Sequence, residues 1–423
     1  MREIPDISIK NSECTLLFPF HHRFVSLKQA EKVENWKNWL IRLNLYEKKD
    51  IYNSLLSFQP HIRDLLSPEM DQPVTIQSTQ HLTFMLGGEP FSSDFTLQSY
   101  KKTEWENFEG HISFIDAYLF SNEMGLLMIN INPKCDSLNQ LSAFLQTLKV
   151  ISIRDELNFP HLNLSAFPNS KKIASINDLI NFLLENIIYP DYLGGKNGQK
   201  YTKTSIGKRE SERCHTFVYA QIWDKENISN SKIDATNLEL RDLWLYKIGM
   251  ITSDRNEETL TDEYIKKMVN EHHIDLWESC QCIVSNNNAT FLEFVNNTES
   301  NETALSNETA LSNNIKKEYF FLYIYCICQK IKLLRLQDNL INTYNNEYEE
   351  YELDLQEVLI QMAEFQDHFW FADVARNSLI EEIYKKYQYA LEIKALYDCI
   401  NDKINNLYRL YLTLVGKIQL NQS

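Results

Sequence analysis

The sequence predicts an α+β protein: an N-terminal α/β region, ferredoxin-like or with a mixed sheet, followed by a long antiparallel helical stalk with coiled-coil character. Three observations support this prediction. All ten prolines lie at or before Pro190, and nine of the ten glycines lie at or before Gly249. The front of the chain alternates short apolar strands with amphipathic helices. The back carries a helical pattern without either of the residue types that break helices.

The composition is that of a globular protein, with 43% hydrophobic and 24% charged residues among 423. The formal net charge is −16, which disfavours nucleic acid and anionic membranes unless a basic patch is present locally. No signal peptide is apparent, and the longest apolar run, residues 319–328, is half of what a membrane span requires. We therefore expect a cytoplasmic protein whose eight cysteines are mostly buried, reduced thiols.

Residues 1–235 are predicted to form the α/β domain. We expect strands at 14–20, 111–120, 126–133 and 214–223, and helices at 26–45, 135–151 and 175–188. The second and third strands flank a short loop containing Gly125, which indicates a hairpin. The order strand, helix, strand, strand, helix resembles one half of a ferredoxin-like fold.

Residues 236–298 are predicted to complete or extend this domain. Residues 259–273 have a helix-capping pattern that begins at Thr261, and the segments 280–284 and 290–295 flank an Asn-rich turn typical of a hairpin. Residues 299–315 follow as a flexible loop, in which the hexapeptide SNETAL occurs twice in tandem. Its polar composition cannot bury a core, and two copies are too few for a solenoid.

Residues 316–423 are predicted to form the stalk, with helices at 316–344, from the acidic stretch to 371, and from 379 onward. Alternating steps of four and three from Leu379 give twelve positions of which eleven are apolar, the seam of a helix about 60 Å long. So long a helix needs partner helices or a second subunit. The predicted interface comprises Leu379, Ile383, Ile393, Tyr397, Ile400, Ile404, Leu407, Tyr411, Leu414 and Ile418.

One local basic run stands out in this acidic chain. Its cations are Lys196, Lys200, Lys203, Lys208, Arg209 and Arg213, interleaved with four glycines. Free backbone N–H groups and mobile positive charge are what an anion site needs, so the run is a candidate for nucleotide or nucleic-acid contact. The run matches neither the phosphate-binding pattern G-x-x-x-x-G-K-[ST] nor the dinucleotide-binding pattern G-x-G-x-x-G. The alternative is a long solvated loop between a helix and a strand.

A second candidate anion-contacting group is His21, His22 and Arg23, directly after the first strand. The alternative is a polar strand exit. The carboxylates and histidine of residues 104–111 and the two Cys-x-Cys pairs match no metal-binding pattern. We therefore predict no metal, no cofactor and no catalytic residue.

The last segment, LYDCINDKINNLYRLYLTLVGKIQLNQS, together with the α/β front, resembles the cytoplasmic part of CorA-type magnesium channels. In that family an α/β/α domain is followed by long stalk helices rich in Leu and Tyr. The resemblance implies a scaffold with a stalk that oligomerises. It does not imply ion conduction, because the sequence has no Gly-Met-Asn pore signature at its end.

Three functional hypotheses remain open, and the sequence leaves undecided whether the protein is an enzyme, leaning against it. The first is a non-catalytic sensor or scaffold that assembles with itself or a protein partner through its C-terminal helices. The second is a nucleotide- or nucleic-acid-responsive effector in bacterial stress or phage defence that uses the basic loop 194–213. The third is a peripheral membrane protein that uses the apolar end of the stalk.

Deleting residues 306–311, one full SNETAL unit, tests the assignment of the repeat to a surface loop. We expect the free energy of unfolding to change by less than about 1 kcal/mol, because loop-closure entropy varies slowly with loop length. Urea unfolding of the full chain with and without the unit measures this. A loss of several kcal/mol would place the repeat inside a packed domain.

Overall fold

The fold is described from a computed structural model. It describes residues 7–21, 39–41, 55–66, 80–86, 89–101, 104–120, 124–150, 161–167, 173–187, 214–223, 238–251, 261–275, 280–295, 312–345, 348–371 and 373–422. The strands are β1 (Ser8–His21), β2 (Trp39–Ile41), β3 (Gln80–Leu86), β4 (Glu89–Pro90), β5 (Ser93–Lys101), β6 (Glu104–Phe120), β7 (Met124–Pro133), β8 (His161–Leu164), β9 (His215–Trp223), β10 (His273–Ile274), β11 (Cys280–Ser285) and β12 (Asn288–Phe294). The helices are α3 (Pro60–Leu66), α4 (Leu138–Val150), α5 (Ile176–Ile187), α6 (Leu238–Gly249), α8 (Asp262–His272), α10 (Phe320–Asn345), α11 (Tyr348–Phe369), α12 (Ser378–Ala390) and α13 (Ile393–Gln422), and a π-helical turn, η4 (Ile315–Tyr319), leads into α10.

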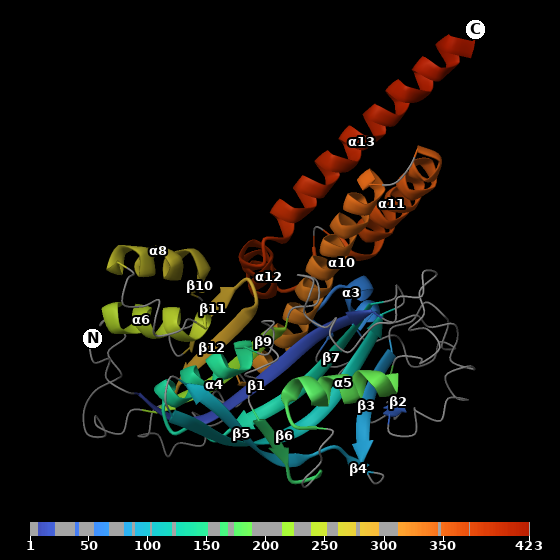
Figure 1. The fold of residues 1–423 in the computed structure, drawn as a ribbon. Coiled ribbons are helices and arrows are strands. Elements are labelled where there is room, and N and C mark those ends of the chain that lie inside the picture. The colour runs from blue at the N-terminus through green and yellow to red at the C-terminus, as the bar shows by residue number, and fades with distance from the viewer. Residues whose placement is uncertain are drawn as a thin grey trace.

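The described strands form one mixed sheet with helices on both faces (Figure 1). One face packs against α3 and α10 to α13, and we call it the α10 face. The other packs against α4, α5, α6 and α8, and we call it the α4 face. Each face has its own apolar core. Alternation along a strand separates the cores: in β7, Leu126 and Met128 belong to the α10 face, whereas Leu127 and Ile129 belong to the α4 face.

The strand order along the sheet is β10-β11-β12-β9-β1-β7-β6-β3-β2, with β5 paired to the first half of β6, β8 paired to β5, and β4 paired to β3. All these neighbours are antiparallel except β12 and β9, which are parallel. In the centre, β7 lies between β1 and β6, and β1 lies between β7 and β9. Consequently β1 and β6 are parallel to each other with β7 between them, and β7 and β9 are parallel to each other with β1 between them.

Most of the predicted elements are confirmed. The hairpin appears as β6 and β7, which pair antiparallel up to Phe120 and Met124. The helices at 135–151 and 175–188 are α4 and α5, and the strand at 214–223 is β9. Thr261 caps α8, its hydroxyl accepting a hydrogen bond from the backbone N–H of Tyr264. The second predicted hairpin is β11 and β12, which extend the same sheet beyond residue 235.

Two predictions are wrong in part. The helix expected over 26–45 fails at Trp39–Ile41, which pairs with β3 as an edge strand, and the rest of that segment lies outside the described residues. An aromatic and a β-branched residue, Trp39 and Ile41, also suit a strand. The single helix expected from residue 379 onward is two helices, α12 and α13. Between them Glu392 has φ of 57°, the left-handed conformation, which ends α12.

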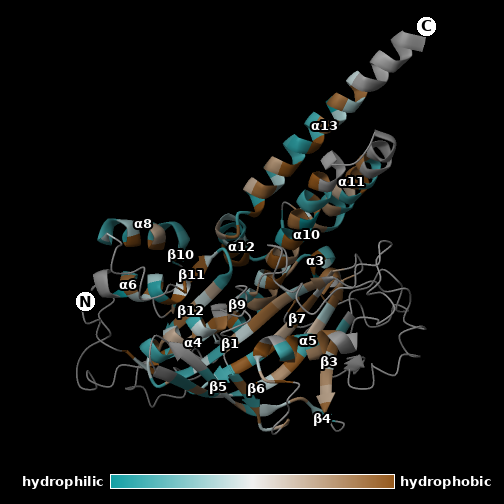
Figure 2. Ribbon diagram, viewed as in Figure 1, coloured by the Kyte–Doolittle hydropathy of each residue, from teal (hydrophilic) through white to brown (hydrophobic). Residues whose placement is uncertain are grey.

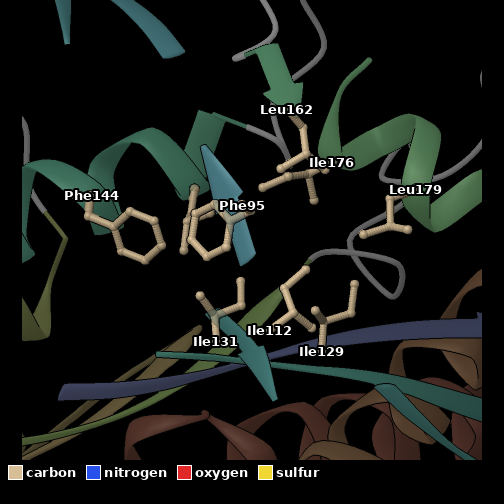
Figure 3. Close-up of a pocket in the computed structure, with 9 residues that line it drawn as sticks. Phe95, Ile112, Ile129, Ile131, Phe144, Leu162, Ile176 and Leu179 are labelled. Atoms are coloured by element: carbon tan, nitrogen blue, oxygen red, sulfur yellow. The ribbon is translucent and has the colours of Figure 1, made fainter. Parts of the chain in front are cut away.

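The core of the α4 face is closed by α4 and α5 over the sheet. Figure 3 shows Phe144 of α4, Phe95 of β5 and Leu179 of α5 on one side of a gap, with Ile131 and Ile129 on the other. The void between these side chains has a volume of only about 10 Å³ and an entirely apolar lining. A space that small holds at most one water molecule, and nothing in its lining would bind one. It is therefore a packing gap in the core and not a ligand site.

In the part of the chain that the structure describes, no helix combines the length and the apolar character needed to cross a membrane. The longest apolar run, 319–328, lies instead at the start of α10, buried between the sheet and the other C-terminal helices. Its hydrophobicity is explained by burial inside the protein.

His215, the first residue of β9, generates a pH-dependent prediction. Burial, with a further contribution from the charge of Lys330, lowers its pKa from 6.5 to about 3. Between pH 6.5 and 3, therefore, the His215 imidazole binds a proton in the unfolded chain but not in the folded chain. Stability contributed by neutral His215 is complete above pH 6.5 and declines as the pH falls, by at most about 1.4 kcal/mol per pH unit.

Replacing His215→Gln should remove this part of the slope. We expect the free energy of unfolding, measured by urea titration from pH 7 to pH 4, to fall less steeply for the variant than for the wild type. The exposed His161→Gln serves as the matched control and should retain the wild-type slope. Equal slopes for the wild type and the His215→Gln variant would contradict a buried neutral imidazole.

Candidate functional site: the helical arm and its root

Three C-terminal helices pack together and leave the body of the protein in one direction. We call α10, α11 and α13 the helical arm (Figure 1). The helix α12 is treated separately, because it contacts β11 of the sheet as well as α10 and α13. Figure 1 shows α13 extending past the hairpin of α10 and α11. The arm is thus the most protruding feature among the described residues.

Most of the predicted seam, in α12 and α13, is buried within the chain. The side chains of Ile383, Ile393, Ile400, Ile404 and Leu407 are at most 4% exposed and belong to the core of the α10 face. Three further seam residues, Leu379, Tyr397 and Tyr411, are partly buried against the same core. The side chains of Leu414 and Ile418 lie outside the described part. Through Leu407 the structure accounts for the seam without a second subunit.

Beyond Leu407 the apolar residues of α13 lose their cover among the described residues. Tyr408, Leu410 and Leu412 are 46%, 49% and 50% exposed. Figure 2 shows hydrophobic residues recurring along α13 as it leaves the body. Apolar side chains exposed at successive turns of a protruding helix are typical of a protein–protein contact.

The root of the arm is held by buried polar contacts. The backbone carbonyl of Phe369, at the end of α11, accepts hydrogen bonds from Gln329 Nε2 at 2.6 Å and from the Tyr325 hydroxyl at 2.9 Å. Gln329 Nε2 also donates to the Tyr384 hydroxyl of α12 at 2.9 Å. These bonds connect α10, α11 and α12 at one point, which fixes the direction in which the arm leaves the body.

A second polar group lies where η4 crosses the sheet. The Tyr219 hydroxyl of β9 donates to Glu293 of β12, and both side chains are 1% exposed. Lys316 of η4 forms an ion pair with Glu13 of β1, Nζ to Oε2 2.5 Å, and its ammonium lies 4.9 Å from the centre of the Tyr219 ring. Burial, followed by the hydrogen bond to Glu293, raises the pKa of Tyr219. Tyr219 therefore stays a neutral donor that anchors the start of the arm.

One surface cluster has the order of a hydrolytic triad. His111 Nδ1 lies 2.9 Å from Asp94 Oδ1, and His111 Nε2 lies 2.9 Å from Ser92 Oγ. The side chains of His111 and Asp94 are 41% and 74% exposed. A Ser–His–Asp triad needs a site that excludes water and holds the substrate. Water competes for both hydrogen bonds here, so we assign the cluster no activity.

The sheet holds one further His–Asp pair, His81 Nε2 to Asp116 Oδ2 at 2.9 Å, with the His81 ring stacked on Tyr118. It joins β3 to β6 inside the sheet. Within the described ranges, no group of three or more His, Cys, Asp or Glu residues could hold a metal ion. Neither finding points to an active site.

The predicted anion-binding residues lie largely outside the described part. Lys196, Lys200, Lys203, Lys208, Arg209 and Arg213 are all undescribed, as are His22 and Arg23. His21 is the last residue of β1, opposite Met124 of β7. The buried contacts at the arm's root were not expected from the sequence. The signal in the sequence was that Gln329 and Lys330 directly follow the longest apolar run, residues 319–328.

No protein-family model, no curated protein and no solved structure matches this chain. The resemblance to CorA-type channels therefore stays a prediction, and the function must be argued from the geometry of this chain alone.

The cysteines provide a test of the packing at the root and along the arm. Five of the eight are buried, Cys135 and Cys214 are half-buried, and Cys399 of α13 is exposed. Burial raises the pKa of Cys135 and of Cys214 to about 12, so both thiols are almost fully protonated at pH 8. We expect one fast-reacting thiol in the native protein when it is titrated with a chromogenic disulfide reagent.

Cys399→Ser should abolish that fast phase, and Cys135→Ser, the matched control, should leave it unchanged. In denaturant all eight thiols of the wild type should react. Two or more fast equivalents from the native wild type would show that the core around the arm is more open than the structure indicates.

Proposed function

We propose that this protein is a non-catalytic scaffold or sensor whose helical arm pairs with the arm of a second copy. One observation carries the proposal: α13 stays helical to Gln422, although its described apolar side chains are covered within the chain only as far as Leu407 and Tyr411. An assembly role is also what the apolar seam and the resemblance to a stalk-bearing family predict.

The length of the uncovered helix supports pairing. Residues 408–422 would extend about 22 Å at 1.5 Å per residue. An isolated helix of this length is marginally stable in water. Tyr408 and Leu412 lie four residues apart and so occupy one face, next to Tyr411 of the seam. A partner helix on this face would stabilise the segment by burying these side chains.

The charge distribution of the chain favours contact between two copies through their arms and disfavours contact between their bodies. The chain carries a formal net charge of −16, so two bodies in direct contact would repel each other. Residues 408–422 contain Arg409 and Lys417 and no acidic residue. Arms about 22 Å long keep the acidic bodies farther apart than the screening length of about 8 Å at physiological salt. A two-fold axis would present the same face from both copies.

Sedimentation velocity of the full chain over a range of concentrations tests the proposal. We expect a monomer–dimer equilibrium, and Leu412→Glu should weaken it at least about tenfold. The reason is that a two-fold interface contains the substitution twice and each copy loses roughly 1 kcal/mol or more of apolar burial. Leu56→Glu is the matched control, because Leu56 is 48% exposed but belongs to the body.

A chain that stays monomeric at all concentrations, or a dimer equally weakened by Leu56→Glu, would overturn the proposal. A dimer that persists in Leu412→Glu and is lost only at high salt would place the interface on charged surfaces elsewhere. Thermal unfolding of each variant shows that the change in assembly is not a loss of folding.

A further inference from the structure

A polar groove lies on the opposite side of the sheet from the arm. It has a volume of about 410 Å³ and is formed by the first part of β6, the outer side of α4, and Lys247 of α6. This volume falls within the range of about 300–1,000 Å³ found for small-molecule sites. The groove is independent of the proposed assembly function.

Most of the exposed lining surface of the polar groove is apolar, but four of its nine lining residues carry side-chain amides: Asn107, Asn139, Gln140 and Gln146. Each amide offers two N–H donors and one carbonyl acceptor. Three of them are oriented by contacts within the protein. Asn139 Oδ1 accepts from Lys247 Nζ at 3.2 Å, Gln140 Oε1 accepts from the backbone N–H of Asp136 at 2.8 Å, and Gln146 Nε2 donates to Ser142 Oγ at 3.3 Å. The amides are therefore held in place before a ligand arrives.

The charges of the polar groove balance. Glu106 contributes one negative charge and Lys247 one positive charge. Lys247 is 8% exposed, with its ammonium 5.4 Å from the centre of the Trp244 ring as well as near Asn139. A ligand with a net charge would upset this balance. One charge, on the ligand, on Glu106 or on Lys247, would then lack an opposite charge in a site that is partly shielded from water. The lining thus favours an uncharged ligand.

Phe108 supplies an apolar wall beside the amides. It is half-buried and packs edge-on against Phe144, with ring centres 5.7 Å apart, so its ring is fixed. A hydroxyl group both donates and accepts a hydrogen bond, as an amide does, and the C–H face of a saturated ring packs on an aromatic wall. We propose that the polar groove binds an uncharged polyhydroxylated ring, the chemistry shared by the ribose of a nucleoside and a hexose unit of a saccharide.

The test uses the full chain and four uncharged probes, adenosine, uridine, maltose and cellobiose, together with AMP and glucose 6-phosphate as charged analogues. Calorimetric titration and ligand-observed NMR should detect binding of at least one uncharged probe below about 10 mM. The binding should change little between low and high salt, and the phosphorylated analogues should bind more weakly. Nucleosides and disaccharides distinguish the two sources of the ring.

Variants then locate the site. Asn107→Ala and Gln146→Ala should each weaken binding about fivefold to tenfold, the effect of one lost hydrogen bond. Asn163→Ala is the matched control, because Asn163 is an exposed amide of β8 outside the groove. Thermal unfolding checks that all three variants fold.

Three outcomes would overturn the proposal. The first is that none of the uncharged probes binds up to about 10 mM. The second is tighter, salt-dependent binding of the phosphorylated analogues. The third is equal weakening by Asn163→Ala and by the groove variants. Each of these can occur with the arm pairing intact, so failure of this proposal is distinct from failure of the assembly function.

Discussion

The burial of α10 on all sides is the constraint on which the rest of the structure depends. Every side chain from Leu322 to Cys328 is fully buried, a run of seven consecutive helical residues. A helix that is apolar all round must be covered on every side. The sheet covers one side through Phe217 and Phe291, and α11, α12 and α13 cover the others. The body and the arm therefore share one core, and the arm begins where α10 runs past the sheet.

That core also contains polar groups that set its geometry. Gln329 is fully buried and Lys330 is 4% exposed, which is costly unless each has partners. Gln329 Nε2 donates hydrogen bonds to the backbone carbonyl of Phe369 and to the Tyr384 hydroxyl. Lys330 Nζ donates to the backbone carbonyl of Asn286 at 3.1 Å. Apolar packing alone would tolerate sliding of one helix on another. Because these hydrogen bonds form in only one register, they select it.

The sequence correctly predicted those strands and helices whose formation depends on interactions between residues close together in the chain. Alternation identified β9, the short predicted loop around Gly125 identified the hairpin of β6 and β7, and a capping pattern at Thr261 identified α8. The break between α12 and α13 was missed, because the apolar spacing continues through Leu391 and no Gly or Pro marks it. Tertiary packing makes the break, since α12 lies beside β11 while α13 follows α10 and α11. An apolar seam shows which face of a helix is buried, but it does not show which other element packs against that face.

The same limit applies to the candidate sites. The predicted interface reached the end of α13 through Tyr411, Leu414 and Ile418, because one helix carries them, but it did not include the exposed Tyr408, Leu410 and Leu412. The polar groove was not predicted, because Asn107, Asn139 and Lys247 come from three elements and meet only when α4 and α6 pack on the sheet. The pair of Gln329 and Phe369 likewise joins residues 40 positions apart. Contacts of this kind are consequences of the fold and leave no pattern in the sequence.

The polar groove and the helical arm lie on opposite faces of one sheet, which bears on whether they communicate. Coupling between two sites requires an element with two arrangements that both sites bias. The strands between them are filled on both faces: Val218 and Ala220 are buried on the α4 face, and Phe217 and Tyr219 on the α10 face. A shift of one residue in β9 would exchange these faces and break the bond from Tyr219 to Glu293. We therefore expect the sheet to act as a rigid partition, so that a ligand bound in the groove would leave the proposed pairing of the arms unchanged.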